Sequence, residues 1–81
     1  MVRLYVQIYP KNQMRPAVQV HVPLPAVPRN EKEIPWFVME RLQKHGVTSQ
    51  QVKQILLGLH KPGSKIRLHT ASHDVVVEIL P

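Results

Sequence analysis

The sequence predicts an α+β fold in which an antiparallel sheet carries two helices packed on one face. Two observations predict this class. Pairs of segments with alternating apolar residues stand near both ends of the 81-residue chain, and two segments with helical periodicity stand between them. The resulting order of strand, strand, helix, helix, strand, strand (ββααββ) favours layers around one core. Residues 1-81 are therefore expected to form a single domain.

The first two strands are expected to form a hairpin. Apolar residues occupy every second position from Val2 to Tyr9, and Ala17 to Val22 alternates again after a polar turn between Pro10 and Pro16. The prolines of residues 23–28 cannot supply N–H groups to a central strand. That segment is therefore expected to be an extended linker toward the helices.

The first helix is expected to begin between Glu33 and Pro35, because proline is favoured in the first turn of a helix. It is expected to end near His45, where Gly46 provides a stop. Its large apolar side chains are expected to lie in the core; they are Trp36, Phe37 and Met39.

The second helix has the clearest local signals. Thr48 and Gln51 have the spacing of a capping box, in which each side chain binds the backbone N–H of the other residue. Apolar residues then follow the helical spacing i, i+3, i+4, i+7, at Val52, Ile55, Leu56 and Leu59. The segment from His60 to Gly63 is expected to close the helix.

Two more strands are expected at Lys65 to His69 and at Val75 to Leu80, joined by a polar turn at residues 70–74. The first alternates basic and apolar residues. The second is so rich in valine that we expect a central strand, or one covered on both faces.

The charge of the chain favours a polyanionic partner. Eleven Lys and Arg residues stand against five Asp and Glu residues, which gives a formal charge of +6 at pH 7. Such an excess attracts nucleic acid over long range and gains free energy from counterion release. Nucleic acid is the expected partner, DNA more than RNA, and an acidic protein surface is the alternative.

Cysteine usage and hydropathy exclude several classes. The chain has no cysteine, which excludes a disulfide scaffold, thiolate zinc sites and cysteine nucleophiles. No apolar run approaches the ~20 residues that span a bilayer, and the alternating first residues do not resemble a signal peptide. We expect a cytoplasmic protein without cofactor, metal or membrane, whose small core could be stabilised by a homodimer.

Residues 38–57 resemble the helix-turn-helix DNA-binding motif. The resemblance rests on Gly46, Val47 and Thr48 in the turn and on Val52 and Ile55 at the family's spacing. It implies that the exposed side of the second helix meets bases and phosphates, through Ser49, Gln50, Lys53, Gln54, Leu57 and Lys61. The last hairpin would assist as a wing, through Lys65, Arg67 and His69.

The sheet offers another nucleic-acid surface. If the apolar sides of the strands pack on the helices, the opposite side presents Arg3, Tyr5, Gln7, Tyr9, Gln19, His21, Lys65, Arg67 and His69. Unpaired bases stack on aromatic rings, and cations attract the phosphates. This face would therefore suit a single-stranded nucleic acid.

Two further functions are compatible with the sequence. A non-enzymatic regulator or inhibitor would use the Trp36 and Phe37 pair, or Leu57, against a larger acidic partner. A metal-independent ribonuclease would draw its acid, base and phosphate-stabilising groups from His60, Lys61, Lys65, His69 and His73. No spacing fixes a catalytic pair among these residues, so no enzymatic activity is expected.

Overall fold

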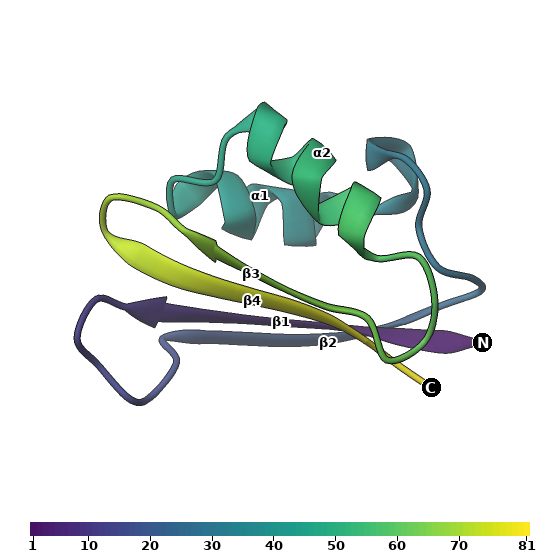
Figure 1. Cartoon of the computed structure of the whole chain (residues 1–81), viewed down its shortest axis with the longest axis horizontal. Coiled ribbons are helices and arrows are strands. Elements are labelled where there is room, and N and C mark those ends of the chain that lie inside the picture. The colour runs from purple at the N-terminus through teal and green to yellow at the C-terminus, as the bar shows by residue number, and fades with distance from the viewer.

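The computed structural model describes all 81 residues and confirms the α+β class. Seven elements follow one another (Figure 1): β1 (Val2–Pro10), β2 (Val18–Leu24), the 3-10 helix η1 (Glu31–Glu33), α1 (Trp36–Lys44), α2 (Ser49–Gly58), β3 (Lys65–His69) and β4 (His73–Leu80). The short η1 is the one element absent from the predicted order. Both longer helices lie on the same side of the sheet.

The strands form one antiparallel sheet in the order β2-β1-β4-β3. The two hairpins therefore join through β1 and β4, where Leu4 pairs with Ile79 and Val6 pairs with Val77. This confirms β4 as a central strand. It begins at His73, two residues before the predicted start at Val75.

Strand β2 extends further into the proline-rich segment than the sequence predicted. It begins at Val18 and continues through Pro23 to Leu24, which pairs with Val2 of β1. Because β2 is an edge strand, the absent N–H of Pro23 can lie on the side without a partner strand. The linker to the helices is correspondingly shorter.

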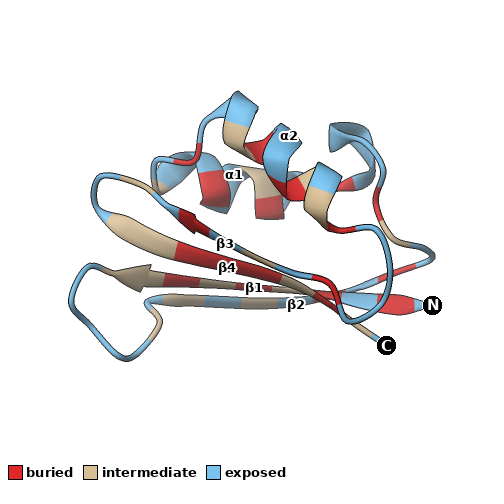
Figure 2. Ribbon diagram, viewed as in Figure 1, coloured by how far each residue is buried: buried red, intermediate tan, exposed pale blue.

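The core lies between the sheet and the helices, and Figure 2 shows the buried segments at this boundary. The even-numbered residues of β1 point toward the helices, and Leu4, Val6 and Ile8 are at most 2% exposed. The same cluster includes buried side chains of both helices: Val38, Leu42, Val52 and Ile55. No helix covers the opposite face of the sheet.

The start of α2 is built as the sequence predicts. Thr48 Oγ1 accepts the backbone N–H of Gln51 at 3.1 Å, and Gln51 Oε1 accepts the backbone N–H of Thr48 at 3.0 Å. These bonds satisfy N–H groups that the first turn leaves without helical partners. Before them, Gly46 takes a φ of +92°, a conformation that side chains other than glycine rarely adopt.

The prediction that Trp36 and Phe37 lie in the core is wrong. Trp36 is 74% exposed and Phe37 is 40% exposed. The residues of α1 that face the core are Val38 and Leu42, which stand four apart and share one side of the helix. At 100° per residue, Trp36 lies far around the helix from Val38, so these aromatic rings remain at the surface.

Candidate nucleic-acid interface

The sheet face that the helices leave uncovered, called the open face from here on, is polar and basic. Strand pairing sets its side chains in rows across all four strands. In one row Tyr5 pairs with His21 on β2 and with Glu78 on β4, and Glu78 pairs with Lys65 on β3. Tyr5 therefore stands between His21 and Glu78, and Lys65 lies beyond Glu78 on the edge strand.

Two further rows follow along the strands. In the next row Gln7 pairs with Gln19 and Val76, and Val76 pairs with Arg67. The last row contains Tyr9, Asp74 and His69. The nine residues that the sequence assigned to this side of the sheet all lie on it: Arg3, Tyr5, Gln7, Tyr9, Gln19, His21, Lys65, Arg67 and His69.

One tyrosine of the open face is held by its neighbour. The rings of Tyr5 and His21 meet edge to face, with centroids 4.0 Å apart and an interplanar angle of 74°. Such a contact limits the rotation of both rings. Tyr5 and Tyr9 are each half-buried, so part of each ring remains accessible to a ligand.

A shallow cleft of about 260 Å³ lies among the rows of the open face. Its lining residues are Gln7, Tyr9, Gln13, Lys65, Arg67, Asp74 and Val76. Val76 is 8% exposed although it faces away from the helices, and it offers the cleft an apolar surface. The cleft thus combines amides able to bond base edges, cations able to bind phosphate and a tyrosine ring.

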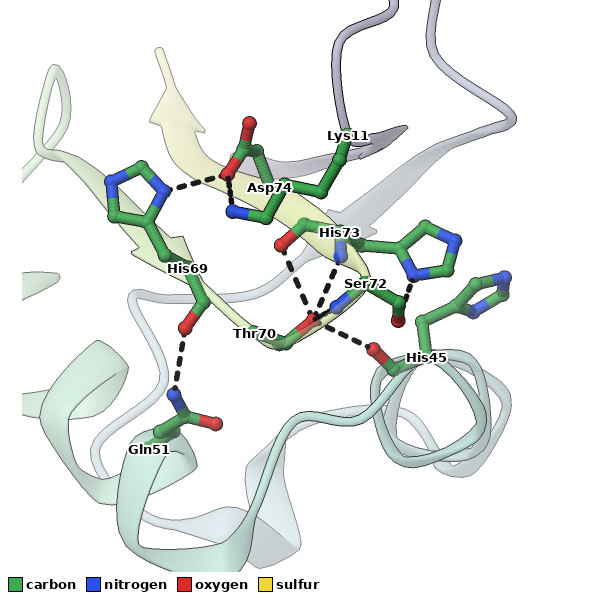
Figure 3. A network of polar contacts seen from close by, with 8 residues as sticks. All are labelled: Lys11, His45, Gln51, His69, Thr70, Ser72, His73 and Asp74. Atoms are coloured by element: carbon green, nitrogen blue, oxygen red, sulfur yellow. Dashed lines mark hydrogen bonds and ion pairs between the residues drawn. The ribbon is translucent and has the colours of Figure 1, made fainter.

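The acidic residue of this cleft is engaged by two neighbours (Figure 3). Lys11 Nζ donates to Asp74 Oδ1 at 2.7 Å, and His69 Nδ1 lies 2.6 Å from the same oxygen. These hydrogen bonds hold the pKa of the Asp74 carboxyl below its ordinary value of 3.8, and the bond from Lys11 has the larger effect. Lys11 therefore offsets the charge of the Asp74 carboxylate at this end of the cleft.

The turn between β3 and β4 is fixed by hydrogen bonds to both helices. Thr70 Oγ1 accepts the backbone N–H of His73 at 3.0 Å and lies 3.3 Å from the carbonyl oxygen of His45, just after α1. Gln51 Nε2 donates to the carbonyl oxygen of His69 at 3.3 Å (Figure 3). His69 and Asp74, at the two ends of this turn, are thereby held at one edge of the open face.

The histidines proposed for ribonuclease chemistry do not gather at one place. His60 follows α2, where its Nδ1 contacts the carbonyl oxygen of Gly58 at 3.1 Å. His69 belongs to the open face, whereas the ring of His73 lies beside that of His45 at 4.9 Å. Lys65 starts β3 and His69 ends it. No two of the proposed histidines thus face a common substrate position.

The residues predicted from the helix-turn-helix resemblance are all exposed, but they occupy two surfaces. Those of α2 lie on its outer side, and Leu57 is 82% exposed. They are Ser49, Gln50, Lys53, Gln54 and Leu57. Lys61 follows in the next turn. Lys65 and Arg67 lie on the open face, on the other side of the sheet from α2. The last hairpin therefore does not extend the surface of α2.

Sequence patterns did not point to the β1–β2 turn as part of the interface. Its Lys11 binds Asp74, and its Gln13 lines the cleft. Their only signal was the polar composition of that turn, which is common to many turns.

None of the protein-family models, curated proteins or solved structures with which the chain was compared matches it. No helix has the length and apolar character needed to cross a membrane. No group of three or more His, Cys, Asp or Glu side chains is arranged to hold a metal ion.

Proposed function

We propose that this protein binds single-stranded nucleic acid across the open face of its sheet. The observation that carries the proposal is that one uncovered sheet face presents the half-buried rings of Tyr5 and Tyr9 on β1 and the exposed cations Lys65 and Arg67 on β3. The strand between them, β4, places Glu78 and Asp74 on the same face. Stacking platforms flanked by basic residues are the common means by which proteins bind unpaired bases.

Each kind of side chain has a separate part in the proposed complex. Lys65 and Arg67 bind phosphates, which releases condensed counterions and makes affinity depend on salt. Tyr9 stacks with a base, and Gln7 bonds to its polar edge in the cleft. Asp74 is kept ionised, and its charge is balanced by Lys11 so that it does not repel the strand.

The outer side of α2 is the second candidate, with duplex DNA as its ligand. One observation favours it: the exposed side of this capped helix belongs to a segment, Gly46 to Ser72, that contains no carboxylate. It ranks second because Lys53 is the single cation on the outer side of α2. The open face has three cations, Arg3, Lys65 and Arg67, together with the two carboxylates Glu78 and Asp74, and it carries the tyrosine rings that α2 lacks.

Two double variants, each with two charge reversals on one surface, distinguish which surface binds nucleic acid. Fluorescence anisotropy would measure binding of single-stranded RNA, single-stranded DNA and duplex DNA at two salt concentrations. Lys65→Glu with Arg67→Glu changes the open face, and Lys53→Glu with Lys61→Glu changes the α2 side by the same total charge. We expect the first pair to lower single-strand affinity by roughly tenfold or more, and the second pair to have a small effect.

Three outcomes contradict the proposal. A preference for duplex that is lost only with the α2 pair favours the second candidate. Equal losses with both pairs indicate attraction by net charge without a defined surface. No salt-sensitive binding to any of the nucleic acids at low salt excludes both surfaces.

A further inference from the structure

A further candidate binding surface, distinct from the open face and from the outer side of α2, lies around the exposed ring of Trp36. Trp36 begins α1, and its ring meets that of Phe37 edge to face, with centroids 5.9 Å apart. Beside it is an open cleft of about 720 Å³, called the Trp36 cleft from here on. Its lining residues are Glu31, Lys32, Ile34, Pro35, Trp36, Met39, Glu40 and Gln43.

The aromatic ring at this cleft is largely uncovered by the rest of the chain. Trp36 is 74% exposed, although a large aromatic side chain contributes most to stability when it is removed from water. The indole N–H makes no hydrogen bond inside the protein. Exposed Trp residues beside a cleft are typical centres of binding energy in protein interfaces.

The charge at the Trp36 cleft is opposite to that of the rest of the protein. Residues 31–40 hold three of the five carboxylates of the chain, against the single cation Lys32. Both ion pairs of the structure involve Asp74, so Glu31 and Glu40 form none despite eleven Lys and Arg residues in the chain. Unpaired carboxylates beside an exposed indole ring attract a cation and repel phosphate.

We propose that the Trp36 cleft binds a basic peptide segment of a partner protein. An Arg or Lys side chain of the partner lies on the indole ring of Trp36, between the carboxylates of Glu31 and Glu40. Apolar side chains next to it in the partner cover the exposed parts of Pro35 and Met39. The proposal differs from the expectation of an acidic protein partner at Trp36, because Glu31 and Glu40 would repel an acidic surface.

The proposal does not depend on nucleic-acid binding at the open face. The Trp36 cleft is formed by η1 and α1 in the helix layer, and no residue of it belongs to the sheet. A single-stranded nucleic acid on the open face and a basic peptide at Trp36 can therefore be bound at the same time. The two sites have opposite charge preferences, so a variant of one is a control for the other.

Trp36 is the only tryptophan of the chain, so its fluorescence reports this cleft alone. The probe is a synthetic heptapeptide, GLRLRLG, with two matched peptides in which citrulline or glutamate replaces arginine. Titration at roughly 0.15 M salt limits attraction and repulsion from distant charges, because the Debye length is then about 8 Å. We expect a saturable change in Trp36 fluorescence with the arginine peptide only.

Two single substitutions test the role of the carboxylates. Glu40→Gln removes a charge at the cleft, whereas Glu78→Gln removes the same charge from the open face. We expect Glu40→Gln to weaken binding of the arginine peptide by roughly threefold or more, and Glu78→Gln to leave it unchanged. Trp36→Ala, followed by the anisotropy of a fluorescein-labelled peptide, should abolish saturable binding while the circular dichroism of the fold is retained.

Four results overturn the proposal. They are the absence of a saturable response at millimolar arginine peptide, equal binding of the citrulline peptide, equal effects of Glu40→Gln and Glu78→Gln, and unchanged binding by Trp36→Ala. Sedimentation of the protein without peptide tests whether the cleft is instead occupied by a second copy of the chain. A dimer that Trp36→Ala dissociates would assign the cleft to a second copy of the chain instead.

Discussion

Gln51 and His69 join the helix layer to the edge of the sheet. The side-chain Nε2 of Gln51 donates to the carbonyl oxygen of His69 at 3.3 Å, while its Oε1 accepts the backbone N–H of Thr48. One amide group therefore closes the capping box of α2 and holds the end of β3 (Figure 3). This double use makes Gln51 more important for stability than a half-buried polar residue usually is.

Gln51→Ala should lower the free energy of unfolding by about 1–2 kcal/mol, because it removes both hydrogen bonds. Gln51→Glu retains an acceptor for the N–H of Thr48 but loses the donor to His69, so its loss should be smaller. Urea denaturation followed by circular dichroism measures both. Equal midpoints for Gln51→Ala and the unchanged protein would contradict the role given to this amide.

Asp74 should make the stability of the protein depend on pH in the acid range. Its folded-state pKa is lowered, by the hydrogen bond from Lys11 and then by that from His69. The stabilisation is therefore fully present above the ordinary pKa of 3.8 and is lost as the pH falls through the lower, folded value. Asp74→Asn should be less stable than the unchanged protein at pH 6, and this difference should shrink as the pH falls below 3.8.

Thermal unfolding from pH 6 down to strongly acidic conditions tests this. A stability difference that stays constant through the acid range would show that the Asp74 ion pairs do not contribute. Lys11→Met provides the control, because it removes the first cause of the lowered pKa and should reduce the pH dependence without changing the carboxyl group itself.

Because Trp36 is exposed and Leu42 is buried, alanine substitutions at these two positions of α1 should differ in their effect on stability. Trp36→Ala should change the free energy of unfolding by no more than about 0.5 kcal/mol, as for ordinary surface substitutions. Leu42→Ala should cost about 2–5 kcal/mol, because Leu42 is 2% exposed and its removal leaves a cavity. Chemical denaturation followed by circular dichroism measures both, since Trp36 supplies the fluorescence signal. A large loss with Trp36→Ala would place this ring in the core after all.

Gly58→Ala should destabilise the protein although alanine favours helices by about 1 kcal/mol. A Cβ at Gly58 would lie 2.0 Å from Cδ1 and 2.6 Å from Cγ1 of Ile66, where the end of α2 crosses β3. We expect a net loss of about 1–2 kcal/mol from the forced repacking. In an Ile66→Ala background the same change should be neutral or stabilising, and a loss of equal size there would contradict this explanation.

The salt dependence of nucleic-acid binding should distinguish phosphate contacts from base contacts on the open face. If nucleic acid binds there, Arg67→Ala should reduce the slope of log affinity against log salt by about 0.7, the value for one phosphate contact on a single strand. Gln7→Ala should lower affinity without changing the slope, because an amide displaces no counterion. Equal slopes for all three proteins would mean that Arg67 does not bind phosphate.

Local signals in the sequence were sufficient for the elements that depend on near neighbours. Thr48 and Gln51 determine the start of α2, and the alternation of β1 determines which of its sides is buried. The core side of α1 was misjudged because Trp36 and Val38 are both apolar. The choice between them depends on how the helix packs on the sheet, which composition does not specify.

The candidate interface depends on strand pairings that no local sequence pattern contains. Lys11 and Asp74 are 63 positions apart, and they meet only because β1 and β4 are neighbours. The division of the predicted binding residues between α2 and the open face has the same origin. The periodicity of β3 predicted that Lys65 and Arg67 share a side, but not that this side faces away from α2.

The pairing of β1 with β4 also affects how the protein is made in the cell. The hairpins β1–β2 and β3–β4 each join neighbouring segments, but the centre of the sheet joins Arg3 to Leu80. During synthesis the ribosome must release β4 before β1 gains its second neighbour, so the nascent chain lacks the β1–β4 backbone pairing until then. Completion of the sheet is therefore expected to wait until β4 has left the ribosome.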